Sequence, residues 1–145
     1  MDLLQFLVPL GWIETVGPSI PIAIFVLVIA NIGTRIMENR MQARQAKNGE
    51  EITRHPLNTF VTMGIVTLGL LFVVYRPTSG MILMLPIIGL FIADVFEFEG
   101  RRVEADNDLD FEWPKATLFS LGLALIYAAY YALAPLYGPY LDLLF

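Results

Sequence analysis

The sequence predicts an all-α, polytopic membrane protein with four transmembrane helices and short interfacial segments at its N- and C-terminal ends. The chain is 57% hydrophobic and only 16% charged, whereas soluble domains are about 45–50% apolar and about 25% charged. Its mean hydropathy is +0.65. Four apolar runs approach the roughly 20 residues that a spanning helix needs. They are continuous rather than alternating, which favours helices over a β-barrel.

The four runs indicate one membrane domain, residues 1–145. Proline is tolerated in a first helical turn, so Pro18, Pro56 and Pro114 fit the starts of the first, second and fourth helices. Pro86 lies inside the third, where it predicts a kink. The expected spans are residues 18–34, 57–75, 80–96 and 115–134, and the expected cytoplasmic loops are residues 35–56 and 97–114.

Residues 1–16 are apolar but too short to span. They lack the positive stretch and cleavage site of a signal peptide. We expect this segment to lie at the membrane interface, with Trp12 at headgroup level. The tail PYLDLLF is similar.

The basic residues predict the topology. Eight of the nine fall in two of the three connections, while the second connection holds only Arg76. Basic loops mark the cytoplasmic side, so both termini are expected outside a cell membrane. The eight are Arg35, Arg40, Arg44, Lys47, Arg54, Arg101, Arg102 and Lys115.

Several classes of site are excluded or disfavoured. The chain has no cysteine, which excludes disulfides, thiolate metal sites and cysteine nucleophiles. Its net charge of -5 argues against nucleic acid as a partner. There is one histidine and no phosphate-binding loop or Ser-His-Asp set. We therefore expect no cofactor and no enzymatic activity.

A metal site is a minor alternative. One histidine and several carboxylates share the predicted cytoplasmic side, and together they could bind a hard or borderline cation. Their spacing matches no EF-hand, HExxH or di-metal carboxylate pattern, and the histidine precedes a proline, as a helix-start residue would. The candidates are Asp94, Glu97, Glu99, Glu104 and His55.

A charged arm is expected beyond the first span. Helix would continue past Thr34 until Asn48-Gly49 ends it. The arm would face the acidic loop 97–112 and could pair with it within a subunit or between copies, contact anionic lipid, or dock a cytoplasmic partner. The candidate cytoplasmic contact residues are Arg35, Arg40, Arg44, Lys47, Arg101 and Arg102.

Small residues recur every four positions along the fourth span. Such a stripe lets another helix approach closely, either from the same chain or from a neighbouring subunit. The stripe is Ala116, Ser120, Ala124, Ala128 and Ala132. The predicted partners are therefore the lipid bilayer and either further copies of the chain or other membrane subunits.

The predicted membrane interior holds few polar residues. Asn31, Thr62 and Thr67 could line a path for a small solute. We expect no lysine or arginine to be buried among the spans, which weakens an ion-coupled transporter hypothesis.

The stretches RHPLNTF, GLFIADVFEFEGRRVEADNDL and WPKATLFSLGLALIYAAYYAL resemble a family of small four-span membrane proteins from halophilic archaea. That family is uncharacterised. The resemblance implies a cell-membrane location and supplies no catalytic residues.

These observations favour a non-enzymatic subunit or scaffold of a membrane assembly. A small-solute or ion channel or transporter formed by an oligomer is the first alternative. A membrane enzyme or metal-binding sensor that uses the acidic loop is the second.

Overall fold

The computed structural model describes residues 15–136 and 138–139. A short 3-10 turn, η1 (Gly17–Ser19), precedes four helices, and there is no strand among these residues. All four helices are long and apolar enough to cross a membrane, which confirms the predicted fold class. The helices are α3 (Ile20–Lys47), α4 (Pro56–Tyr75), α5 (Pro77–Asp106) and α6 (Lys115–Ala132).

Two predicted interfacial segments fall on residues that are not described. Residues 1–14, which include Trp12, lie outside the described residues, as do residues 137 and 140–145.

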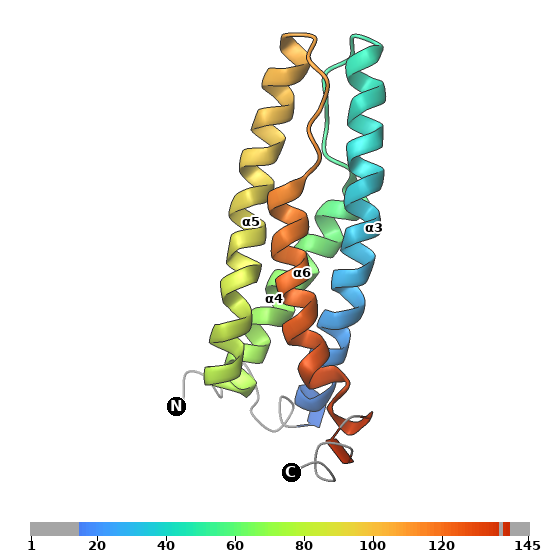
Figure 1. Ribbon diagram of the computed structural model, residues 1–145. Helices are drawn as coiled ribbons and strands as arrows, with labels where there is room; N and C mark the ends of the chain where they lie inside the picture. The colour runs from blue at the N-terminus through green and yellow to red at the C-terminus, as the bar shows by residue number, and fades with distance from the viewer. Residues whose placement is uncertain (1–14, 137, 140–145) are drawn as a thin grey trace.

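The helices form an antiparallel four-cornered bundle (Figure 1). The main contacts join α3 to α4 and α6, and α5 to α4 and α6. Helices α3 and α5 therefore occupy one diagonal of the bundle, and α4 and α6 the other. The apolar core between them includes Ile24, Val28, Ile65, Leu83, Ile87, Leu90, Leu121, Ala124 and Ala128, all with 0% exposure.

The helices come in two lengths. Helices α3 and α5 have 28 and 30 residues, whereas α4 and α6 have 20 and 18. At 1.5 Å per residue the first pair is about 42 and 45 Å long and the second about 30 and 27 Å. The extra length projects from one end of the bundle, and connections 48–55 and 107–114 run back beside it (Figure 1).

The projecting C-terminal ends of α3 and α5, here called the arms, end in the same capping motif. Gly49 has a φ of 71° and donates to the carbonyl of Ala46, and Glu50 donates to the carbonyl of Gln45 at 2.8 Å. These are the two hydrogen bonds of a Schellman motif. The predicted stop at Asn48-Gly49 is confirmed. Helix α5 ends in the same way, but Asp108, with a φ of 55°, stands where α3 has glycine.

The opposite end contains a very tight connection. Only Arg76 separates α4 from α5, and its N–H donates to the carbonyl of Phe72 at 2.7 Å. A Cβ atom on Gly80 would lie 2.5 Å from the backbone nitrogen of Val73, so only glycine fits this position. Helix α5 continues through Pro86.

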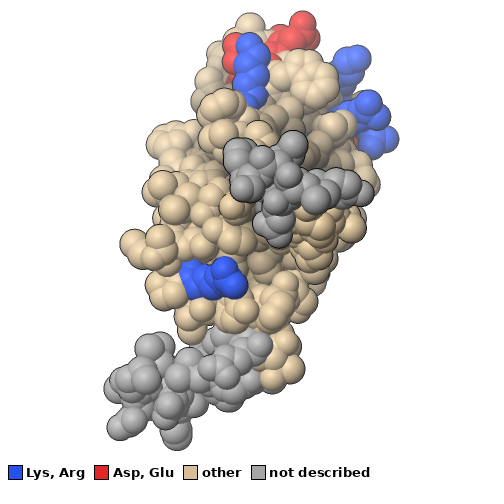
Figure 2. Space-filling model, turned by 60° about the horizontal axis from the view of Figure 1, so that its bottom comes forward, with Lys and Arg blue, Asp and Glu red and all other residues tan. Residues whose placement is uncertain are grey.

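The bundle surface is largely apolar along its length, and charged side chains gather at the end with the arms (Figure 2). Phe60, Leu85 and Ile126 are each at least 70% exposed. Such a surface on a soluble protein would aggregate, whereas a bilayer would cover it.

Candidate functional site

A polar network fills the bundle interior toward the arm end. On α3 the buried residues continue in steps of three or four from Ile24 and Val28 to Asn31 and then to polar residues. Residues at this spacing share one helix face. The face that builds the apolar core therefore also builds the network, through Asn31, Arg35, Glu38 and Gln42.

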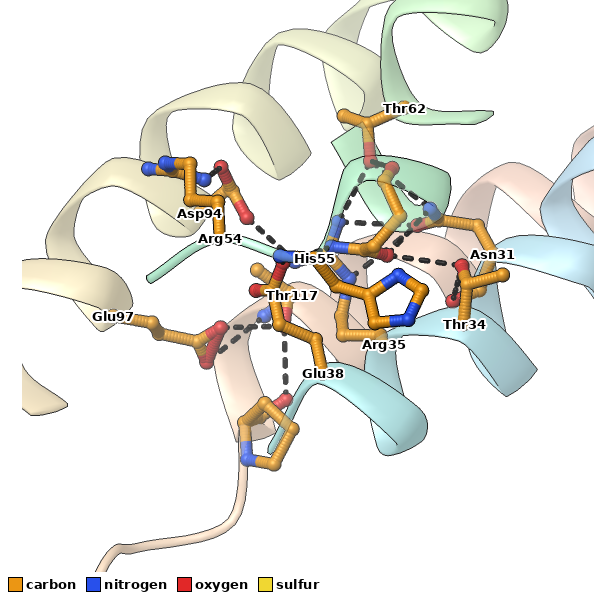
Figure 3. Close-up of polar contacts among 12 residues, drawn as sticks. Asn31, Thr34, Arg35, Glu38, Arg54, His55, Thr62, Asp94, Glu97 and Thr117 are labelled. Atoms are coloured by element: carbon orange, nitrogen blue, oxygen red, sulfur yellow. Dashed lines mark hydrogen bonds and ion pairs between the residues drawn. The ribbon is translucent and has the colours of Figure 1, made fainter. Parts of the chain in front are cut away.

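Asp94 of α5 lies at the centre of one half of the network (Figure 3). Its Oδ1 is 2.7 Å from Nη1 of Arg35, and its Oδ2 is 2.6 Å from Nη1 of Arg54. Arg35 is only 2% exposed, whereas the Arg54 side chain is 34% exposed and lies over the ring of Phe98. Asp94 thus neutralises one fully buried and one partly buried cation.

Asn31 connects this ion pair to α4. Its Nδ2 donates to Oδ1 of Asn58 at 3.1 Å and to Oγ1 of Thr62 at 2.9 Å. Its Oδ1 accepts from Nε and Nη2 of Arg35. Thr34 donates to the same Asn58 oxygen at 3.0 Å. The amide orientation of Asn31 is fixed because both its donors and its acceptor are used.

Glu38 organises the other half. Its Oε2 accepts from the backbone N–H of His55 at 3.0 Å and from Nδ2 of Asn58 at 3.2 Å. Its Oε1 is 3.4 Å from Nη2 of Arg101 on α5. Arg101 also donates to Gln42, which donates to the carbonyl of Thr53 at 3.0 Å. This cluster fixes connection 48–55 against α3 and α5.

The fourth helix joins through Thr117. Its hydroxyl donates to Glu97 of α5, and its backbone N–H, in the first turn of α6, donates to the same carboxylate at 3.4 Å. A carboxylate at a helix N-terminus is favoured by the helix dipole. The network of Asp94, Asn31 and Glu38 joins α3, α4 and α5, and the adjoining Glu97–Thr117 contact ties α6 to α5.

The charges of the network balance, and nearly all of its buried polar atoms have hydrogen-bond partners. Together with the adjoining Glu97 it contains three arginines and three carboxylates, and within the described chain the one buried side-chain polar atom without a partner is Oδ1 of Asn39. A satisfied buried network rigidifies a core and specifies one packing. The six charged residues are Arg35, Arg54, Arg101, Glu38, Asp94 and Glu97.

The predicted cytoplasmic contact residues separate into two groups. Arg35 and Arg101 are buried inside the bundle, at 2% and 5% exposure, so the expectation that no arginine lies buried among the spans is wrong. The physical reason is that carboxylates on neighbouring helices compensate them. The other four, Arg40, Arg44, Lys47 and Arg102, are exposed, and only Arg102 forms an ion pair within the described part, with Glu99 at 3.2 Å.

The metal candidates are not brought together. Among residues 15–136 and 138–139, no three His, Asp or Glu side chains gather to hold an ion. His55 caps α4 by accepting the N–H of Leu57 through Nδ1 at 3.2 Å, Asp94 belongs to the network, and Glu97 accepts from Thr117. Glu99 pairs with Arg102, and Glu104 accepts from the backbone of Glu112.

The small-residue stripe divides between two environments. Ala124 and Ala128 are fully buried against the protein's own helices. Ser120 and Ala132 are half-buried, and Ala116 is exposed. Intramolecular packing therefore uses the middle of the stripe and leaves its N-terminal part accessible.

The suggested polar path is not continuous. Asn31 and Thr62 are hydrogen-bonded to each other, but Thr67 is exposed on the outer side of α4 and donates to the carbonyl of Met63. Thr67 therefore plays no part in the interior network.

A groove runs along the outer face between α5 and α6. A hollow of about 690 Å³ near the start of α6 adjoins one of about 570 Å³ farther along, and both are lined by Gly89, Phe119 and Ser120. Ala93 and Ala116 are further small residues in its lining, and Glu104, Glu112, Trp113 and Lys115 line its polar end.

The comparisons with known proteins point to one family. The model of the domain of unknown function DUF7313 matches residues 2–145. The chain belongs to this family. No curated protein and no solved structure matches it. DUF7313 carries no assigned function, which confirms that the chain resembles an uncharacterised family.

Proposed function

We propose that this protein is a non-enzymatic subunit or scaffold of a membrane assembly, and that it pairs with a second copy of itself through the α5–α6 groove. The observation that carries this proposal is the groove itself. It is open sideways along two helices that are apolar enough to span a membrane, and its lining includes the small residues Gly89, Ala93, Ala116 and Ser120.

The groove suits a helix as its occupant. Gly89, Ala93, Ala116 and Ser120 allow a second backbone to come close, and close backbone packing drives helix association in lipid. Phe119 is 67% exposed at its edge, where a docked helix would cover it.

The charges at the polar end suit a second copy. Lys115 lies on the same groove as Glu104 and Glu112, and none of the three forms an ion pair in the part of the chain that is described. A two-fold interface places a patch against itself. Lys115 of one copy would then face a carboxylate of the other, so the mixed patch is self-complementary.

The hydrogen bonds of the buried carboxylates support a non-enzymatic role. Both carboxylate oxygens of Asp94 and both of Glu38 accept from groups of the same chain. A carboxylate so engaged is a structural group rather than a free acid or base.

The proposed location is the cell membrane of a halophilic archaeon, with both termini outside and both arms in the cytoplasm. Eight of the nine basic residues lie toward the arm end, and seven of the nine are arginine. The topology is tested by labelling with an impermeant maleimide in sealed cells. Thr78→Cys near the α4–α5 turn should react, and Gly49→Cys at the α3 arm should not; the reverse pattern would overturn it.

Disulfide cross-linking tests the dimer directly, because the chain has no cysteine of its own. Ala116→Cys in the groove should give a covalent dimer in native membranes. Thr67→Cys is the matched control, since it is also exposed but lies on α4. Equal cross-linking of the two variants, or a monomer from Ala116→Cys, would overturn the proposal.

A charge exchange provides the second test. Lys115→Glu alone and Glu112→Lys alone should each weaken the dimer, and the double variant should restore it. Dimer content is measured by native gel after mild extraction.

A further inference from the structure

A small cavity lies on the opposite edge of the bundle, between α3 and the start of α4. Its volume is about 190 Å³, and it is lined by Met37, Arg40, Met41, Arg44 and His55. Three nitrogen-bearing side chains thus converge over two methionines.

The arginines of this cavity are available for a ligand. Arg40 and Arg44 are exposed, lie one helical turn apart on α3, and form no ion pair with any described residue. Arg35, Arg54 and Arg101, in contrast, are each paired with a carboxylate. The nearby Glu38 faces inward and is used by Arg101, Asn58 and the His55 backbone.

The start of α4 adds two further favourable groups. The Nδ1 atom of His55 accepts the N–H of Leu57, so the proton of the neutral imidazole is on Nε2, which is left as a donor. The N-terminus of α4 carries the positive end of its helix dipole, which favours anions.

The position relative to the apolar surface identifies the ligand class. Met37 lines the cavity and is 49% exposed; Leu57 and Phe60, in the first turns of the adjacent α4, are 48% and 76% exposed. The cavity therefore lies where the apolar, lipid-facing surface gives way to charge. That is the level of the phosphate groups of a bilayer.

We propose that this cavity binds the phosphate of an anionic phospholipid, with the hydrocarbon chains of the lipid running along Met37, Leu57 and Phe60. Arginine pairs with phosphate through two parallel hydrogen bonds, and anionic lipids are attracted to clustered basic residues next to a span. A zwitterionic lipid binds less well because its own cation meets two arginines. The proposal is independent of the dimer, since the site lies on the α3–α4 edge and the groove on the α5–α6 edge.

Native mass spectrometry of the full chain in detergent tests the proposal, with phosphatidylglycerol and phosphatidylcholine titrated separately. The protein should retain one phosphatidylglycerol, with at least tenfold lower affinity for phosphatidylcholine. Arg40→Gln with Arg44→Gln should lower phosphatidylglycerol affinity at least tenfold. Lys47→Gln with Arg102→Gln is the control, because it removes the same charge outside the cavity. Equal retention by the two double variants, or equal affinity of the native protein for both lipids, would overturn the proposal.

Two further measurements complete the experiment. An excess of inorganic phosphate should leave phosphatidylglycerol bound; displacement would show a site for a free anion and overturn the lipid assignment. Arg40→Lys with Arg44→Lys keeps the charge but loses the paired hydrogen bonds, so its affinity should fall severalfold. This variant decides the matter if the glutamine variant does not fold, and an unchanged affinity would contradict the proposal.

Discussion

Arg35 and Asp94 join the two helices that lie diagonally across the bundle. Arg35 belongs to α3 and Asp94 to α5, and their charged atoms are 2.7 Å apart. Glu38 and Arg101 form a second bridge between the same helices at 3.4 Å, with the charges reversed. Because α3 and α5 make their main contacts with α4 and α6 rather than with each other, these ion pairs and the hydrogen bond from Arg101 to Gln42 connect the two helices across the diagonal.

Neutralising Asp94 should strongly destabilise the protein. Asp94→Asn leaves Arg35 buried without a counter-charge, and removing one partner of a buried ion pair typically costs about 3–5 kcal/mol. Glu99→Gln is the control, because the Glu99–Arg102 pair is exposed, and it should cost less than about 1 kcal/mol. Reversible unfolding in mixed micelles measures both. If Asp94→Asn lowered the free energy of unfolding no more than Glu99→Gln does, the burial of the Arg35–Asp94 ion pair would be contradicted.

The two arginines that share Asp94 should differ in importance. Arg35→Ala removes a cation that is 2% exposed and leaves Asp94 and Asn31 with unmet hydrogen-bonding capacity. Arg54→Ala removes a side chain that is 34% exposed, where solvent can replace it. We expect the free energy of unfolding to fall by at least twice as much for Arg35→Ala as for Arg54→Ala, measured in the same micelles. Equal losses in the free energy of unfolding would show that the interactions of Arg54 contribute as much to stability as those of Arg35.

The sequence is sufficient to predict the four helices, but it hides the network for a specific reason. Hydropathy ends the first span at Thr34 because the residues after it are charged, and that reasoning places Arg35 in a cytoplasmic loop. The helix continues beyond Thr34, as the sequence also predicts, but its inward face stays inside the bundle through Arg35, Glu38 and Gln42. Extending the three-and-four spacing of Ile24, Val28 and Asn31 beyond the hydrophobic run is the signal that finds these residues.

The pairing partners on the other helices are harder to predict. Asp94 continues the inward spacing of Ile87 and Leu90 on α5, so its burial follows from the same pattern. That Asp94 meets Arg35 depends on how far α3 and α5 are shifted along their axes relative to each other. Connection 48–55 contacts both helices, α3 through Thr53 and His55 and α5 through Arg54. One sequence carries no local signal for such alignment.

The two arm ends offer a paired test of capping. Gly49 and Asp108 occupy the same position of a Schellman motif, with φ values of 71° and 55°. Residues with a side chain are strained in this conformation, so Gly49→Ala should destabilise the protein by about 1 kcal/mol and Asp108→Gly should stabilise it by about 0.5–1 kcal/mol. Thermal unfolding in micelles checks both. Shifts of the same sign would show that the two ends do not share one geometry.

The α4–α5 turn should tolerate no side chain at Gly80. A methyl group there would lie 2.5 Å from the backbone nitrogen of Val73, and backbone can relieve the overlap only if the two helices move apart. We expect Gly80→Ala to destabilise the protein by about 1–3 kcal/mol or more.

Gly33→Ala is the matched control, because it makes the same change inside a helix with nothing within 4 Å of the new atom. It should be neutral or stabilising by up to about 1 kcal/mol, since alanine is the better helix former. Unfolding in mixed micelles measures the difference between the two variants. A Gly80→Ala protein as stable as Gly33→Ala would contradict this geometry. It would mean that α4 and α5 lie farther apart at the turn than the structure shows.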